Sequence, residues 1–156
     1  GRGHQTELIG WTMIQKPADL LAVAAKLSNS MRSASGLPTA MGHALAYASI
    51  QLQDAPPCLF QTIDMAGDGA NNAGFSPASV YATFPFDGVP VNGLMIGEVE
   101  SGAQGYYETE VIRGPASFVE VASAFADFEA TMQRKLIREL TVHVIGGAVT
   151  PTKDQG

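Results

Sequence analysis

Segments with strand-like and helix-like periodicity alternate along the chain, and this alternation limits the fold more than any other feature. Short apolar or alternating runs predict strands in QTELIGWTMI, CLFQTIDMA, VPVNGLMIG and SFVEV. Helical spacing is found in KPADLLAVAAKLSN, TAMGHALAYASIQLQ, SPASVYATF and ASAFADFEATMQRKLIREL, and GYYETEVI is expected to form a short helical turn. This order predicts an α/β fold with a mostly parallel sheet flanked by helices.

The apolar positions also predict which side chains face the core. Within the strands, Ile9, Trp11 and Met13 share one face, and Cys58 is expected to be a buried, inert thiol. The helices present three apolar stripes: Leu20, Leu21, Ala24 and Leu27; Met41, Leu45, Ala48 and Leu52; and Phe125, Phe128, Met132 and Leu136. Pro17 suits a first helical turn, and Ser76 is expected to cap the helix that follows it.

Charge and length exclude several classes of partner. The chain has 156 residues, 46% of them hydrophobic, which suffices for one domain with one core. The formal net charge is −6, and no basic cluster interrupts it, so we expect no nucleic-acid partner and no anionic-membrane partner. No apolar stretch approaches the roughly 20 residues of a spanning helix, so no transmembrane segment is expected. A cation suits this chain better than an anion.

The stretch TIDMAGDGANNAG (residues 62–74) is the candidate ligand loop, because ligands of α/β sheets bind where strands end in loops. It is not a dinucleotide fingerprint, since Asn72 stands where the third glycine belongs and Asp68 would place a carboxylate near a pyrophosphate. No Gly-Lys-Ser/Thr triplet of a P-loop occurs, and the oxygen-bearing residues lack the spacing of a calcium loop. A carboxylate among small residues remains, which suits a hard cation held by several loops.

TIDMAGDGANNAG resembles the fourth-strand motif of von Willebrand factor A-like domains. It is closest to a bacterial family of such domains with unassigned function, in which an Asp-Gly-x-Asn-Asn run follows that strand. TAMGHALAYA resembles the threonine-initiated helix of that family, and VNGLMI resembles its next strand. YYETEVIRGPASFVEV and FADFEATMQRKLIREL resemble its last strand and helix, and GRGHQTELIGWTMI its hairpin turn and edge strand. The resemblance covers residues 1–140, with its motifs in the right order.

This resemblance implies a metal-ion-dependent adhesion site. There a divalent ion is held by an Asp-x-Ser-x-Ser run after the first strand, a threonine before a helix and an aspartate after the fourth strand. Thr39 matches the threonine and Asp68 matches the aspartate, whereas the Asp-x-Ser-x-Ser run has no match. The implied cofactor is Mg²⁺ or Mn²⁺, with Ca²⁺ as an alternative. An acidic side chain of a protein partner is expected to complete the coordination.

The resemblance further implies that residues 1–140 are the C-terminal portion of such a domain, without its first strand, first helix and most of its second strand. Residues 141–156 break the pattern and are expected to form an extra strand or a disordered end. Buried unpaired backbone groups cost about 1–3 kcal/mol each. We therefore expect the missing strands to come from an N-terminal fragment of the same protein or from another chain, and a homo-oligomer is an open alternative. Export signals among relatives imply a periplasmic or secreted location.

Each candidate residue also has a plainer interpretation. Asp68 is also a turn residue, and Thr39 is also a helix N-cap. Asp64 is expected to be structural and hydrogen-bonded to a neighbouring loop, and Asn71 and Asn72 to satisfy backbone groups of their loop.

The expected function is recognition of a protein or other ligand through the metal site, without catalysis. No nucleophile has a neighbouring base and an orienting third group in a recognisable pattern. Two alternatives stay open: a structural, self-assembling subunit with a vestigial metal site, and a hydrolase that uses Asp64 and Asp68.

Overall fold

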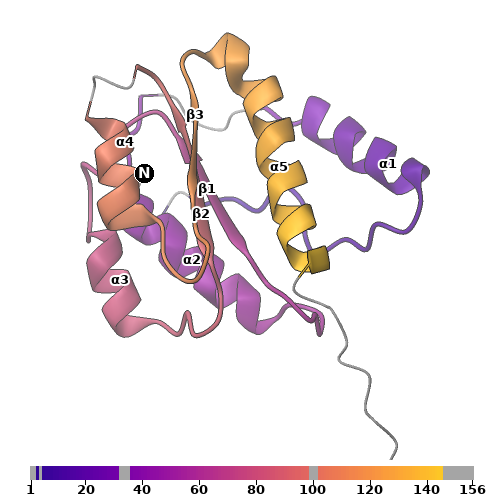
Figure 1. Cartoon of the computed structure of the whole chain (residues 1–156), viewed down its shortest axis with the longest axis horizontal. Coiled ribbons are helices and arrows are strands. Elements are labelled where there is room, and N and C mark those ends of the chain that lie inside the picture. Colours follow the sequence, from indigo (N-terminus) through magenta and orange to yellow (C-terminus); the bar gives the residue numbers. More distant parts are fainter. Residues whose placement is uncertain (1–2, 4, 32–35, 99–101, 146–156) are drawn as a thin grey trace, which may run out of the picture. The chain divides into compact units, whose positions relative to one another are not determined.

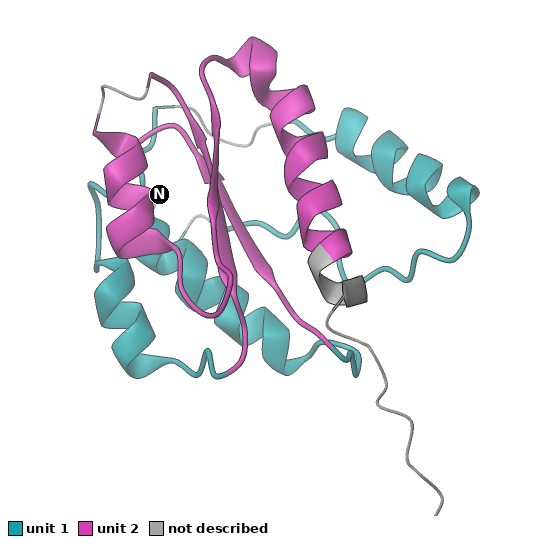
Figure 2. Cartoon of the chain, viewed as in Figure 1, with its two compact units in different colours: residues 1–59, 70–87 teal, residues 60–69, 88–156 magenta. Residues whose placement is uncertain are grey.

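A computed structural model of the chain describes residues 3, 5–31, 36–98 and 102–145 (Figure 1). The chain divides into two compact units, shown in separate colours in Figure 2. Residues 1–59 and 70–87 form the first, here called the helical unit, and residues 60–69 and 88–156 form the second, here called the sheet unit.

The sheet unit contains three parallel strands in the order β1 (Ile63–Gly67), β2 (Val91–Ile96) and β3 (Val119–Ala122). In the register, Ile63 lies opposite Val91, and Gly93 lies opposite Val119. All six residues of the central strand β2 are buried, as expected for a parallel strand covered on both faces. These strands confirm the predicted α/β class with a parallel sheet flanked by helices.

Helices cover both faces of this sheet. Short α4 (Ala103–Tyr106) continues into the π-helical turn η2 (Tyr107–Val111), and the 3₁₀ turn η3 (Phe125–Asp127) leads into the long helix α5 (Phe128–Ile145). Figure 1 shows α4 and α5 on opposite sides of the strands. On the α5 side, the buried core of Leu94, Ile96 and Ala122 packs against Phe128 and Met132. None of the described helices has the length and apolar character needed to cross a membrane.

The helical unit contains α1 (Pro17–Ser28), α2 (Met41–Gln53) and α3 (Pro77–Thr83), close to the predicted ranges. Pro17 lies in the first turn of α1, and the Ser76 hydroxyl accepts a hydrogen bond from the Ser79 N–H (3.2 Å), so both predicted helix starts are confirmed. Helix α2 packs against α3.

The strand predicted for residues 5–14 is wrong. No strand occurs there, and Trp11 and Met13 are 56% and 69% exposed. The alternating pattern forms a strand only where a neighbouring strand supplies hydrogen bonds, and among the described residues none pairs with this segment. The Trp11 indole instead donates to the Gln51 carbonyl (3.2 Å).

Several expectations of burial also failed. Helix α1 has no buried residue, and its Leu20 and Leu21 are more than half exposed. The last apolar stripe is only partly covered, since Phe125 is 71% exposed. Strand β1 begins at Ile63, later than predicted, so Cys58 is exposed instead of lying in a buried strand.

The predicted tail begins as helix, because α5 continues to Ile145. Residues 146–156 lie outside the described part of the chain.

Candidate functional site

Asp68 immediately follows the last residue of β1 and is exposed. Its carboxylate forms no hydrogen bond or ion pair with any described residue. The carboxyl ends of parallel strands are the edge at which α/β sheets bind ligands. The side chain is therefore both available and on the ligand-binding edge of the sheet.

Thr39, in the helical unit, is held on both sides of its backbone by the loop that Asp68 opens. Its N–H donates to Asn72 Oδ1 (2.8 Å). Its carbonyl accepts from the N–H groups of Asn72 (2.9 Å) and Ala73 (3.0 Å). The Thr39 hydroxyl itself has no hydrogen-bond partner among the described residues. The backbone is thus fixed while the side-chain oxygen remains available.

Asn71 caps helix α2. Its Oδ1 accepts from the Met41 N–H (2.7 Å), and its Nδ2 donates to the Phe75 carbonyl (3.4 Å). The N-cap position of α2 is Ala40, without a side-chain cap of its own, so the interpretation of Thr39 as a plain N-cap is wrong. The expectation for the loop is confirmed for Asn71, which donates to the Phe75 carbonyl, but the side-chain oxygens of Asn71 and Asn72 accept from backbone groups outside their loop.

We name residues 71–75 the asparagine loop. Gly42 lets this loop approach α2, because a Cβ at Gly42 would lie 2.1 Å from the Phe75 carbonyl oxygen. The imidazole of His43 stacks on the Phe75 ring at 3.9 Å between centroids. The loop is therefore seated on the first turn of α2 by capping, close approach and ring stacking together.

Replacing Asn71 with alanine should lower the free energy of unfolding by about 1 kcal/mol, because the Met41 N–H loses its cap. Urea denaturation of both proteins measures the difference. Asn71→Asp, which keeps the accepting oxygen, should remain close to wild type. An equal loss in Asn71→Asp would contradict this account of the cap.

A carboxylate and a hydroxyl are hard oxygen donors, the ligands that Mg²⁺ and Mn²⁺ accept. Asp68 in the sheet unit and Thr39 in the helical unit are each such a donor, because neither side-chain oxygen is occupied by another described residue. Asn71 and Asn72 fit less well, since their side-chain oxygens already accept backbone hydrogen bonds. Among the residues in the described ranges, no three His, Cys, Asp or Glu side chains group closely enough to hold a metal by themselves. Any ion here would depend on further ligands, such as water or a partner.

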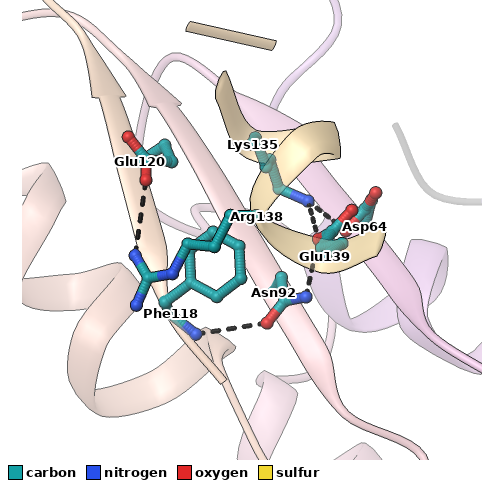
Figure 3. A network of polar contacts seen from close by, with 7 residues as sticks. All are labelled: Asp64, Asn92, Phe118, Glu120, Lys135, Arg138 and Glu139. Atoms are coloured by element: carbon teal, nitrogen blue, oxygen red, sulfur yellow. Dashed lines mark hydrogen bonds and ion pairs between the residues drawn. The ribbon is translucent and has the colours of Figure 1, made fainter. Parts of the chain in front are cut away.

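Asp64 does not lie at this site and does not bond to a loop as expected. Its carboxylate forms an ion pair with Lys135 of α5. The Lys135 side chain is fully buried. Lys135 also pairs with Glu139 (2.5 Å), and Glu139 accepts from Asn92 Nδ2 (2.6 Å), as Figure 3 shows. Since the Asp64 carboxylate is bound to Lys135, its use as half of a hydrolytic pair with Asp68 is less favoured.

Within this network the pKa values of the Asp64 and Glu139 carboxyl groups shift in opposite directions. Burial raises the pKa of Asp64 above its ordinary value of 3.8, against the opposing effect of Lys135. Burial also acts to raise the pKa of Glu139, but hydrogen bonds from Lys135 and its other partners outweigh burial, and that pKa falls below 4.5. The network therefore disfavours the charged form of Asp64 and favours the charged form of Glu139, while Lys135 pairs with both.

A cavity of about 50 Å³ lies beside this network and is lined by Asn92, Phe118 and Glu139 together with Thr62 and Pro90. Thr62 and Pro90 immediately precede β1 and β2, so the cavity lies at the amino ends of the strands. Asp68 lies at the opposite ends. The cavity is separate from the candidate site.

Tyr107 is a residue that the sequence interpretation did not select. Its side chain is fully buried, and its hydroxyl has no hydrogen-bond partner among the described residues. Burial, and next to it the negative charge of Asp68, raise the pKa of this phenol. The only sequence signal is a tyrosine that falls on the inner side of a short helix, which packing alone would explain.

Residues 1–144 match the family described as "Protein of unknown function (DUF1194)", and the chain belongs to that family. Comparison with curated proteins gave no match, and comparison with solved structures gave none either.

Proposed function

We propose that this member of the DUF1194 family recognises a protein or another acidic ligand through a divalent metal ion. The ion is Mg²⁺ or Mn²⁺, Asp68 supplies a carboxylate oxygen, and Thr39 supplies a hydroxyl oxygen. The fold of a von Willebrand factor A-like domain, to which the sequence is similar, is part of the same proposal.

The observation that carries the proposal is that each of the two oxygens, taken within its own unit, has no hydrogen-bond partner among the described residues. The asparagine loop uses its own amide oxygens on the backbone of Thr39 and Met41, and leaves the Thr39 hydroxyl without a partner. Asp68 lies three residues before Asn71, and its exposed carboxylate has no partner among the described residues. The Thr39 backbone is held while its hydroxyl is available, so little ordering of this segment remains to be done on binding.

In this proposal the chain's residues bind and orient, and none of them transfers a proton. Asp68 binds the ion by charge, and Thr39 adds a neutral oxygen. Asn71 and Asn72 hold the segment that carries Thr39. When bound, the ion supplies a positive charge that an acidic side chain of the partner can share. With only two oxygens assigned to this chain, coordination positions remain for the partner and for water.

Calorimetric titration of the purified protein with MgCl₂ or MnCl₂ tests this function. We expect saturable binding of one ion, and at least about 10-fold weaker binding in Asp68→Ala and in Thr39→Val. Asp87→Ala is the matched control, because Asp87 is also an exposed loop aspartate and should bind as wild type. Binding that is unchanged in Asp68→Ala would contradict the assignment.

A second candidate function is a structural, self-assembling subunit. It is favoured by β1, which pairs with β2 alone among the described strands. Because the Ile63 N–H bonds the Pro90 carbonyl, the backbone groups of Asp64 and Ala66 point to the other edge, where no described strand pairs with them. Such edges add strands from other chains. Sedimentation in chelator separates the two candidates, since oligomers that persist without metal favour this second function.

A further inference from the structure

The cavity at the amino ends of β1 and β2 lies within the sheet unit alone, because each residue that lines it belongs to that unit. It has a volume of about 50 Å³ and is partly open to solvent. A single water needs roughly 10–15 Å³ of such space, and a cavity of about 150 Å³ holds benzene. This cavity therefore has room for a group of about two or three non-hydrogen atoms.

The walls of the cavity are largely apolar and include a strained turn. Phe118 and two prolines line it together with Ala116. The Ser117 N–H donates to the Gly114 carbonyl (3.3 Å), which closes a four-residue turn whose third residue, Ala116, has a φ of 57°. Glycine is the usual residue at that position, because a side chain is disfavoured in the left-handed region. Alanine keeps a methyl group at the wall, and strain of this kind is concentrated at binding sites.

Thr62 and Glu139 bring hydrogen-bond acceptors to the cavity. The bonds that Glu139 accepts from Asn92 Nδ2 (2.6 Å) and Lys135 Nζ (2.5 Å) both end on its Oε1 (Figure 3). A carboxylate offers about four acceptor positions, so Glu139 can accept further hydrogen bonds. The Thr62 hydroxyl has no hydrogen-bond partner among the described residues. A ligand that enters the cavity with N–H groups therefore finds oxygens to accept them.

The charges around the cavity favour a cation. Asp64 and Glu139 share the single ammonium group of Lys135. Arg138, the other basic residue of this network, pairs with Glu120. Acidic groups therefore outnumber basic groups in the network, and Glu139 is the acidic residue that lines the cavity. A cation with N–H donors would meet both the charge and the hydrogen-bonding capacity of this carboxylate.

We infer that this cavity binds the primary ammonium group of a small aliphatic amine. The ammonium donates hydrogen bonds to Glu139 and Thr62, and the short alkyl group contacts Ala116 and Phe118. A purely apolar guest would leave the acceptors without partners, and an anion would be repelled by the Glu139 carboxylate. The inference is independent of the proposed function, because the cavity is lined by neither of the two residues assigned to the metal ion.

Titration with methylammonium chloride, followed by NMR at constant ionic strength, tests this inference on the purified protein. We expect saturable shifts of the side-chain N–H signals of Asn92 and of the Phe118 backbone N–H, because both groups form hydrogen bonds beside the cavity. The dissociation constant should be on the order of 10 mM, since a ligand of so few atoms makes few contacts. Tetramethylammonium chloride is the control ligand, because it has the same charge but is bulkier and has no N–H donor.

Two variants locate the binding. Thr62→Val should weaken methylammonium binding about 5-fold through the loss of an acceptor, and Glu139→Gln at least about 10-fold through the loss of a charged one. Thr83→Val, on an exposed threonine of α3, is the matched control and should bind as wild type. If Glu139→Gln does not fold, Thr62→Val decides, because valine keeps the shape of the side chain. Shifts that do not saturate, equal shifts with tetramethylammonium, or unchanged binding in Thr62→Val would overturn the inference.

Discussion

Replacing Gly42 with alanine should destabilise the protein by roughly 3 kcal/mol, the upper part of the range for overpacked interiors. The added Cβ would lie 2.1 Å from the Phe75 carbonyl oxygen and 2.9 Å from the carbonyl carbon. Both are backbone atoms, so no side-chain rotation relieves the contact. The asparagine loop must move away from α2, and with it are lost the Asn71 cap of α2 and the hydrogen bond of Asn72 to the Thr39 N–H.

Urea denaturation of Gly42→Ala measures this loss. Gly105→Ala is the matched control, because Gly105 is also a helical glycine, and a Cβ there meets nothing within 4 Å. That variant should be neutral or slightly stabilised, since alanine favours helix over glycine. If Gly42→Ala were as stable as Gly105→Ala, the loop would not be seated on α2 as described.

Replacing Lys135 with methionine should cost about 3 kcal/mol at neutral pH. The substitution leaves Asp64 and Glu139 facing each other without a cation, and removing one member of a buried pair typically costs 3–5 kcal/mol. The lower end is expected because the Asp64 side chain is 36% exposed. Arg138→Met should cost at most about 1 kcal/mol, since the Arg138 pair with Glu120 is long (3.4 Å) and half-exposed.

The cost of Lys135→Met should shrink as the pH falls. Without Lys135, the partly exposed Asp64 and the more buried Glu139 each lie beside a like charge, so both folded-state pKa values rise. A raised pKa stabilises the fold while the group is protonated, and that contribution is lost as the pH rises through the folded-state value. Unfolding free energies at pH 7 and near pH 5 measure the difference. A cost independent of pH would show that lost packing, and not charge, explains the defect.

In the wild-type protein the two carboxyl groups act in opposite directions. The raised pKa of Asp64 gives a contribution that is present below 3.8 and lost as the pH rises through the raised value. The lowered pKa of Glu139 gives a contribution that is present above 4.5 and lost as the pH falls through the lowered value. Near neutral pH, Glu139→Gln should therefore destabilise the protein, whereas Asp64→Asn should not.

Local patterns in the sequence predicted most of the helices and strands because helical spacing and strand length are local properties. Helix α2 and strand β2 appear where expected for that reason. The segment at residues 5–14 was predicted wrongly because a strand also needs a partner, and alternation in one segment does not show whether a partner exists. The expected burial of Leu20 in α1 was wrong for a similar reason. The sequence shows the apolar stripe of that helix, but it does not show whether another element packs against the stripe.

Only some residues of the candidate site could be predicted from the sequence. Asp68 and Thr39 could be selected because each lies in a recognisable motif. Local sequence rules could not identify Asn71 as the cap of α2. Asn71 lies 30 residues from Met41, and its side chain accepts the hydrogen bond of the Met41 N–H. Lys135 could not be selected from the sequence, because its partner Asp64 is 71 residues away. Contacts between distant segments decide these roles.

Native mass spectrometry of the purified protein, with Mg²⁺ or Mn²⁺ and then with chelator, tests the central claim most directly. The account predicts one divalent ion per chain in wild type, lost on chelation and lost in Asp68→Ala, but retained in Asp87→Ala. An absence of bound ion in wild type, or an ion that Asp68→Ala retains, would contradict the claim. Oligomers that persist in chelator would then favour the self-assembling subunit.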